Sequence, residues 1–426
     1  MATFLVPSCV GLNPAFEDQA EDGSGGETSK GTGGGGPTGG ASTVASGSAS
    51  GATGASTLST GTGSVSDLGD GTATGSEVMP ANWWDPDYRH RVELVFEPRD
   101  EALSGFVTYV PLNLSPSRLE GVTRSKLAFV DPNSNTRIPA EVPVLVPSAG
   151  ELAAWVQLPV WRSDEPTSVF LYFGYSAPDT PSESPWSGHV AVWHMDELSG
   201  GGLTPDAAGS ADAEQVDAGG SPLSLEPGIV GDALQFDGET NRLGATISDG
   251  LVDDTFLVSA WVLTTSYAEA GSPIIARGDR SGPSWSDHEW VMGFTPDRAE
   301  VRVHDDLLND TEPRNAGVVH PELGWHHYAF LYTGSSIRLY VDGVSPVAAG
   351  VTAGMDHVLS EVSIGGYPDA PAPEWEAGRL EGRIDELRWR RGADVDGPHN
   401  TWVDTLYESQ LEPETTFAVG PVEDLP

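Results

Sequence analysis

The chain has 426 residues, with 63 Asp or Glu against 21 Lys or Arg, so its formal net charge at pH 7 is −42. A surface this acidic repels phosphate backbones and anionic lipids, which argues against nucleic-acid binding and against attachment to membranes through basic residues. The single cysteine excludes an intrachain disulfide, and no apolar run approaches the roughly 20 residues needed to span a bilayer.

The first predicted segment, residues 1–9, ends in that cysteine. Cys9 follows the apolar run Phe4–Val6 and the small residue Ser8, which resembles the cleavage box of bacterial lipoprotein signal peptides. In that family the cysteine carries the lipid of the mature chain. Because Met1–Thr3 has no Lys or Arg and the apolar run is short, we interpret the segment as a signal truncated by a late gene start. The alternative is an incidental cysteine in a disordered tail.

Residues 10–82 consist largely of Gly, Ser, Thr and Ala with scattered acids. So few bulky apolar side chains cannot offset the entropy lost on ordering the chain, so we predict a disordered linker. A flexible coil of about 60 residues spans roughly 40 Å. With a lipid on Cys9 this would be a lipoprotein stalk, and without one a plain linker.

Residues 83–186 contain six short strand-like runs separated by turn residues, which predict a small antiparallel β-sandwich. The runs are Val92–Phe96, Val107–Leu114, Leu127–Val130, Ile138–Val146, Ala153–Leu158 and Val169–Tyr175. Trp83, Trp84 and Tyr88 at its start either form an aromatic platform for a sugar or close the end of a core. Several short segments resemble the uncharacterised domain that often precedes laminin-G-like domains in bacterial surface proteins, a resemblance that implies no enzymatic activity. These segments are Trp84–Arg89, Phe129–Asp131, Trp155–Pro159 and Leu171–Gly174.

Residues 187–426 carry an ordered series of landmarks: Val192–Glu197, Gly231–Gly238, Phe256–Val262, Gly324–Gly343, Val362–Gly366 and Leu380–Trp389. The series resembles the bacterial branch of the laminin-G-like, concanavalin A-like jelly rolls. Strands rich in Val, Ile, Phe and Trp between Gly and Asp turns agree with a two-sheet jelly roll. A weakly amphipathic stretch near Thr401–Ser409 predicts the one helix.

The clearest element is the stretch Gly324–Gly343. Apolar residues occupy both parities from Trp325 to Tyr332, which indicates a strand covered on both faces. A second alternating run, Ile337–Val341, ends at Asp342-Gly343, a strong turn signal, so the stretch is predicted to be a β-hairpin. His326 and His327 are adjacent and point to opposite faces, so they cannot chelate one ion together.

A search for catalytic groups finds no linear motif. Alternating acids on one strand, as in jelly rolls that cleave polysaccharides, are absent, and so is Gly-x-Ser-x-Gly. Glu300, Arg302 and His304 share one face of a predicted strand. Arg302 should hold Glu300 ionised and oppose the raised pKa that a general acid needs. A solvated strand face is the simpler interpretation.

Calcium is the ion that suits this oxygen-rich sequence. The resemblance implies a structural calcium between the opening and closing strands of the jelly roll, where Asp196-Glu197 and Asp385-Glu386 stand. We therefore predict Glu197 and Asp385 as side-chain ligands. The alternative is that Asp385 accepts hydrogen bonds from a turn.

Tyr267, Trp285, Trp290 and Trp375 lie in loop-like stretches with polar neighbours and are the candidate glycan-binding residues. Buried loop anchors are the alternative.

Together these features predict a non-catalytic, monomeric lipoprotein of the bacterial outer membrane or cell surface, lipid-anchored at Cys9 and extracytoplasmic. Its laminin-G-like module would recognise a glycan or a surface protein. The alternatives are a polysaccharide hydrolase or lyase whose acid pair comes from separate strands, and a purely structural surface protein.

Overall fold

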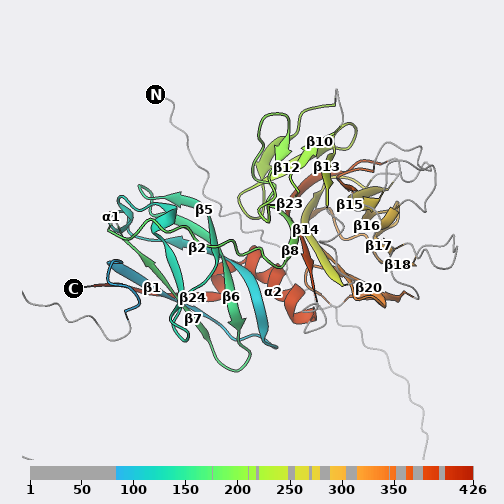
Figure 1. The fold of residues 1–426 in the computed structure, drawn as a ribbon. Coiled ribbons are helices and arrows are strands. Elements are labelled where there is room, and N and C mark those ends of the chain that lie inside the picture. The colour runs from blue at the N-terminus through green and yellow to red at the C-terminus, as the bar shows by residue number, and fades with distance from the viewer. Residues whose placement is uncertain are drawn as a thin grey trace, which may run out of the picture. The chain divides into compact units, whose positions relative to one another are not determined.

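The computed structural model describes residues 83–425, apart from 175, 210, 217–219, 248–254, 268–270, 279–287, 304–313, 345, 352–360, 368–377 and 393–398. These residues belong to one compact unit and are mostly β-strand (Figure 1). The predicted all-β class is confirmed. The signal and the linker predicted for residues 1–82 lie outside the described residues.

Two antiparallel sheets form the first sandwich, in the orders β24-β1-β7-β3-β4 and β2-β6-β5. Each of the six predicted strands overlaps one of these strands, and the two-residue β4 was not predicted. The bounds are β1 (His90–Phe96), β2 (Leu103–Asn113), β3 (Ala128–Asp131), β4 (Thr136–Arg137), β5 (Ala140–Val146), β6 (Glu151–Trp161), β7 (Thr167–Phe173) and β24 (Phe417–Asp424).

The inward faces of these strands bury a continuous apolar core that includes Phe106, Trp161 and Phe173. Trp83 and Tyr88 are buried in a smaller cluster with Tyr172, on the face of the sheet opposite the main core. These two aromatic residues therefore cover the outer face of the sheet and form neither an exposed platform nor the end of the main core.

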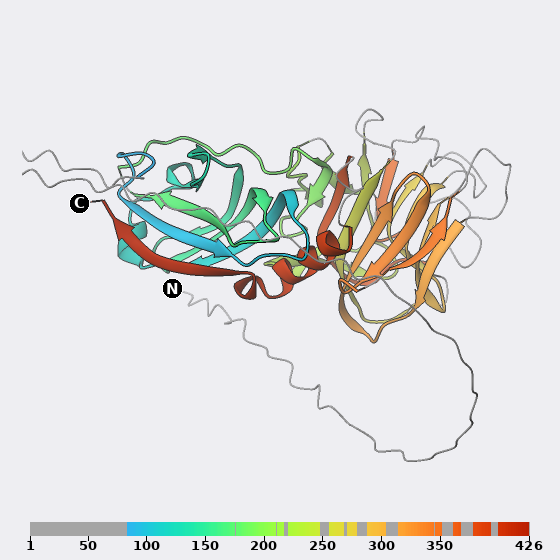
Figure 2. The same ribbon diagram turned by 90° about the horizontal axis from the view of Figure 1, so that it is seen from below.

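The last strand, β24, returns to the first sandwich. It pairs antiparallel with β1, so that Phe417 lies opposite Phe96 and Asp424 opposite His90. Figure 2 shows β24, in red, beside β1, in blue. The sequence boundaries place these residues in the second module, whereas the backbone pairing makes them part of the first sandwich.

The remaining strands form the jelly roll, two large antiparallel sheets around one apolar core. One sheet has the order β18-β17-β16-β15-β22-β13-β10-β9 and the other β11-β12-β23-β14-β19-β20-β21, with β8 also paired to β23. The bounds are β8 (His189–Trp193), β9 (Leu203–Thr204), β10 (Ala213–Gln215), β11 (Ser224–Pro227), β12 (Asp232–Asp237), β13 (Leu243–Thr246), β14 (Phe256–Thr264), β15 (Ser272–Gly278), β16 (His288–Phe294), β17 (Arg298–Val303), β18 (Arg314–Val319), β19 (Gly324–Tyr332), β20 (Ser336–Val341), β21 (Val347–Gly350), β22 (Glu361–Ile364) and β23 (Glu381–Arg391).

The predicted hairpin is β19 and β20, which pair directly. Tyr328 and Phe330 face the jelly-roll core, while Ala329 and Leu331 belong to a separate buried cluster. The strand is thus covered on both faces, as its apolar pattern predicts.

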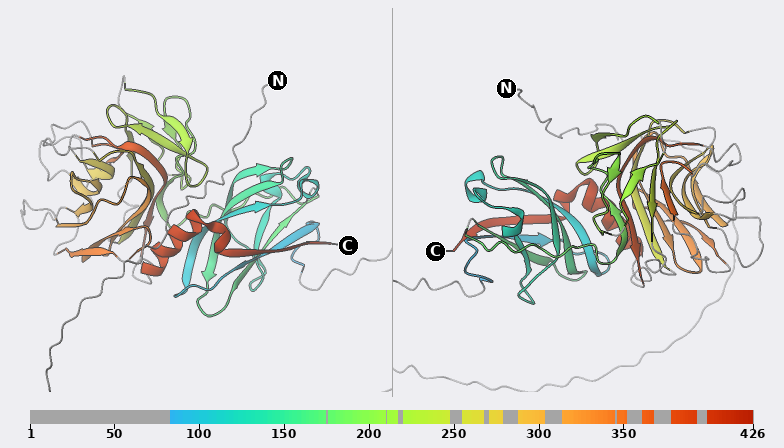
Figure 3. Two further views of the ribbon diagram at one scale, coloured as in Figure 1. Left: turned by 180° about the vertical axis from the view of Figure 1, so that it is seen from behind. Right: turned by 45° about the horizontal axis from the view of Figure 1, so that its top comes forward.

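Helix α2 (His399–Leu411) covers that second face and coincides with the helix predicted near Thr401–Ser409. Its Val403 packs with Leu257 and Leu331 of the jelly roll, while Leu406 joins the core of the first sandwich. The helix, red in Figures 2 and 3, therefore packs against both sandwiches. A four-residue helix, α1 (Pro116–Leu119), was not predicted.

Candidate functional site

A pocket of about 490 Å³ opens where the first sandwich meets the jelly roll. It is called the junction pocket below. Its walls are formed by residues of both sandwiches: Arg124, Glu141, Val142, Pro143, His194, Asp196, Glu197, Pro205 and Ala207. This volume lies within the range of about 300–1,000 Å³ that is usual for small-molecule sites.

The residues just after β8 provide the polar wall on the jelly-roll side. Strand β8 pairs with β23 and ends at Trp193, whose ring is fully buried. Met195 has a left-handed backbone, with φ 64°, although its side chain is completely buried. Such a backbone conformation is rare for a residue other than glycine, and it marks the turn that follows β8. His194 and Asp196, on either side of it, both line the pocket.

His194 joins the two sandwiches through carboxylates. Its Nδ1 lies 2.9 Å from Oε1 of Glu386 on β23, and its Nε2 lies 3.5 Å from Oε2 of Glu141 on β5. Burial lowers the pKa of His194, but Glu386 and Glu141 outweigh burial and raise it to about 10. The imidazole is therefore charged at neutral pH.

Aromatic rings and a guanidinium enclose this ion pair. Arg388 donates to Oε2 of Glu386 from Nη2 at 2.8 Å, and its guanidinium lies 4.1 Å from the ring centroid of Trp155. Trp186 donates its indole N–H to Glu141. Each buried charge thus has an opposite charge and a hydrogen bond, which is what a low-dielectric site requires.

Glu141 and Asp196 have pKa values shifted in opposite directions. Burial opposes ionisation of Glu141, but His194 and the indole of Trp186 lower its pKa. Asp196 as a whole residue is exposed. The pocket walls nevertheless desolvate its carboxyl in part, which raises its pKa, and the negative charges of Glu386 and Glu197 act in the same direction.

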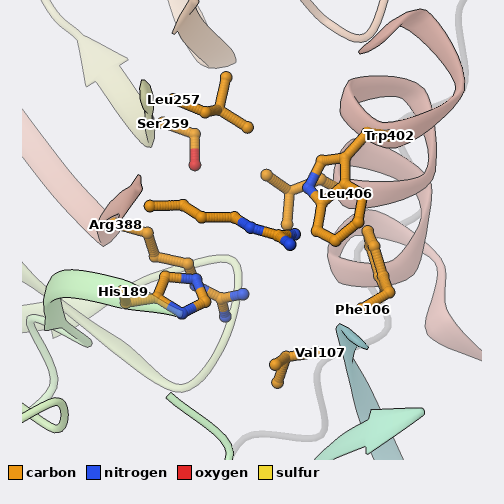
Figure 4. Close-up of a pocket in the computed structure, with 9 residues that line it drawn as sticks. Phe106, Val107, His189, Leu257, Ser259, Arg388, Trp402 and Leu406 are labelled. Carbon is orange, nitrogen blue, oxygen red and sulfur yellow. The ribbon is translucent and has the colours of Figure 1, made fainter. Parts of the chain in front are cut away.

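A second hollow, lined in part by Arg388, lies between helix α2 and strand β14 (Figure 4). Its volume is about 20 Å³, too small for a sugar. His189 lines it, and burial together with Arg390 and Arg388 lowers the pKa of this imidazole far below its usual value. Its Nδ1 is buried without a hydrogen-bond partner. The hollow is therefore a packing feature of the interface around a neutral histidine.

The predicted glycan-binding aromatic residues do not come together at this pocket. Trp290 is completely buried in the jelly-roll core against Phe256 and Trp389, so it has no ring face to offer a sugar. Tyr267 is partly buried and stacks on His320 at 3.7 Å between centroids, with its hydroxyl donating to the carbonyl of Pro321. Trp285, Trp375 and Cys9 lie outside the described residues.

The two predicted calcium ligands have different environments. Glu197 lines the junction pocket and is exposed, whereas Asp385 is fully buried on β23. Oδ2 of Asp385 accepts the backbone N–H groups of Ile229 and Val230 at 2.6 and 2.9 Å, while its Oδ1 is buried without a partner. Burial and the charge of Glu386 raise the pKa of Asp385 well above its usual value, which disfavours the ionised form that calcium needs.

Within the part of the chain that the structure describes, no group of three His, Cys, Asp or Glu side chains is placed to hold a metal ion. The turn that contains Ile229 and Val230 is the hydrogen-bonding alternative foreseen for Asp385. Calcium binding stays a prediction. The described residues also contain no helix both long and apolar enough to cross a bilayer.

Glu300 departs from its prediction. It pairs with Arg302 as expected, but burial outweighs the guanidinium and raises the pKa of Glu300 instead of lowering it. The predicted solvated face was therefore wrong for Glu300, which is only 5% exposed. His304 lies outside the described residues.

Sequence reasoning missed three pocket residues. His194 and Asp196 stand in the first jelly-roll landmark, so their position next to Glu197 was a usable signal. Glu141 had no such signal, because its side chain reaches the site only when the two modules pack against each other.

Comparison with known proteins gives one family match. Residues 238–393 match the model of the concanavalin A-like lectin/glucanases superfamily. The matched region includes β23, which carries Glu386 and Arg388, but it excludes the residues that line the junction pocket. No curated protein matches the chain.

Solved structures of toxin binding domains are among those to which this chain has a distant similarity. The receptor binding domain of botulinum neurotoxin C/D mosaic serotype is 11% identical with a TM-score of 0.37, covering 52% of this chain and 51% of that one. The binding domain of botulinum neurotoxin DC in complex with SialylT has the same values. The chain thus spans about half the length of these structures. We draw nothing about function from a likeness this distant.

Proposed function

We propose that this chain is a non-catalytic carbohydrate-recognition protein whose ligand occupies the junction pocket. The observation that carries the proposal is the pocket itself, which combines a volume suited to a small ligand with converging carboxylates, a guanidinium and an imidazole. Carboxylate and guanidinium groups form paired hydrogen bonds with neighbouring hydroxyls, which are what a sugar ring presents. The match to a superfamily of lectins and glucanases supports this ligand class.

The pocket is also held in shape before a ligand arrives. The ion pairs among Glu141, His194 and Glu386 tie the wall from the first sandwich to the wall from the jelly roll. A site that is already organised loses less conformational entropy on binding, so modest contacts suffice for affinity.

The test is titration of the full chain with a panel of oligosaccharides. Arg124→Ala and Glu197→Ala remove exposed polar groups from the pocket, and each should weaken binding at least tenfold. Glu214→Ala alters an exposed acid that does not line the pocket, and should bind as the unaltered protein does. Binding that survives both pocket substitutions, or no binding to any glycan, would overturn the proposal.

A hydrolase is the second candidate, because one observation favours it. Asp196 and Glu141 line the same pocket with pKa values shifted apart, the pattern of a general acid and an ionised partner. In that case the chain would release reducing sugar from a bound glycan, and Asp196→Asn would abolish release while retaining binding. Binding without release in the unaltered chain supports the recognition protein.

The proposed setting is the bacterial surface, with a lipid on Cys9 and the glycan on a neighbouring cell or matrix. Labelling cells that express the protein with radioactive palmitate tests the anchor. A labelled chain that becomes unlabelled after Cys9→Ala is the expected result.

A further inference from the structure

We infer that the junction pocket selects sugars that carry a free amine over neutral or acidic sugars. The inference rests on the proposed function and names the class of sugar.

The charges around the pocket leave negative charge in excess. His194 is charged, but Glu386 and Glu141 hydrogen-bond to it and neutralise it. Arg388 in turn lies against Glu386. Of the exposed lining side chains, Asp196 and Glu197 are acidic and Arg124 is basic, while Glu141 is partly exposed and is paired with His194.

A tyrosine near the pocket, Tyr109, is also close to these negative charges. Burial raises the pKa of Tyr109 to about 12, and the negative charges of Glu386 and Asp196 act in the same direction. Tyr109 packs on Trp155, which also lies under Arg388. Glu386 and Asp196 thus add negative charge near Tyr109, although burial is the larger cause of its raised pKa.

An ammonium group on the ligand fits this field. It would donate charge-assisted hydrogen bonds to Asp196 and Glu197, which are stronger than those from a hydroxyl. It would also favour ionisation of Asp196, whose carboxyl has its pKa raised in the free protein. A carboxylate on the ligand would instead meet two acids and gain only Arg124.

The experiment uses the full chain and oligosaccharides of matched length in three forms. They have a free amine at C2, the same amine acetylated, or a carboxylate at C6. We expect the free-amine form to bind at least tenfold more tightly than its acetylated counterpart, and the carboxylate form to bind most weakly. The preference should shrink as salt is added, because exposed charges are screened.

Two variants separate this site from the general acidity of the protein. Asp196→Asn with Glu197→Gln keeps hydrogen-bonding groups but removes two of the 63 acids, so non-specific attraction barely changes. This double variant should bind the amine and acetylated forms equally. Glu214→Gln should retain the full preference.

The possible outcomes distinguish the preference for an amine from the proposed recognition of carbohydrate. Equal binding of all three forms by the unaltered chain would overturn the inference and leave the proposed function standing. An amine preference that persists in the double variant would also overturn it, because the selection would then lie elsewhere. Binding to none of the forms of any sugar would overturn the proposed function itself.

Discussion

The buried imidazole of His194, which lies between two carboxylates, should make the protein less stable as the pH becomes alkaline. Although burial lowers it, the pKa of His194 in the folded chain is raised to about 10 by Glu386 and Glu141. In the unfolded chain it is about 6.5. The resulting stabilisation is complete below pH of about 6.5 and is lost as the pH rises towards 10.

We therefore predict that the melting temperature falls between pH 7 and pH 10, and that His194→Gln flattens this fall. The variant should itself be about 1–3 kcal/mol less stable at pH 7, because Glu386 keeps Arg388 but both Glu386 and Glu141 lose the charged imidazole. His326→Gln is the control, since that half-buried histidine has a raised pKa from Asp342 but lies outside the pocket. Parallel pH profiles for the unaltered chain and His194→Gln would contradict the prediction.

Asp385 gives the test of calcium. Bound calcium would convert its carboxyl to the ionised form and raise the melting temperature, by an amount that corresponds to about 2.7 kcal/mol at a hundredfold excess over Kd. Asp385→Asn keeps an oxygen for the amides of Ile229 and Val230, so it should fold and lose the calcium response. Equal melting temperatures of the unaltered chain in chelator and in millimolar calcium would rule the ion out.

The face to which a side chain points was predicted well where the alternation of residues along a strand decides it. Whether a side chain is buried was predicted poorly, because burial depends on distant parts of the chain. His326 and His327 point to opposite faces, as adjacent strand residues must. His326 hydrogen-bonds to Asp342, whereas His327 is buried against Trp261. Trp290 looked like a loop residue, and its neighbours in the core come from strands far away in the chain. No local pattern reports such neighbours.

At the scale of elements, β24 is the unusual feature, because it completes a sheet that begins more than 300 residues earlier. We predict that ending the chain after Leu411 exposes β1 as an edge strand. Hydrogen exchange should then lose protection across β1 and β7 while β14 and β19 stay protected. Unchanged protection of β1 would show that the first sandwich does not need its last strand.

The existence of strands was readable from period-two patterns, and the helix from its weak amphipathicity. Their pairing was not. The register that sets Phe417 against Phe96 depends on side chains meeting in a shared core, where Phe417 packs 5.5 Å from Phe96 between centroids. Sequence proximity instead favoured assigning β24 to the module before it.

At the scale of the whole molecule, Trp402 on α2 connects the two sandwiches. Its ring lies 3.6 Å from the guanidinium of Arg390 and 4.9 Å from the ring of Phe106. We predict that calorimetry of the unaltered chain shows one cooperative transition, and that Trp402→Ala splits it into two. Truncating a partly buried tryptophan costs about 3 kcal/mol or more when its site cannot collapse. Tyr267→Ala, which also removes a partly buried aromatic but within the jelly roll, should lower the single transition without splitting it.

The returning strand also has a consequence for biosynthesis. A ribosome adding about 5–20 residues each second needs roughly 15–60 s to travel from β1 to β24. Throughout that interval the nascent first sandwich presents an open backbone edge, while the jelly roll emerges and can acquire its own strands. The first sandwich is therefore the last part of the protein to complete its sheet. A holdase chaperone that shields β1 would matter most in the final seconds of translation.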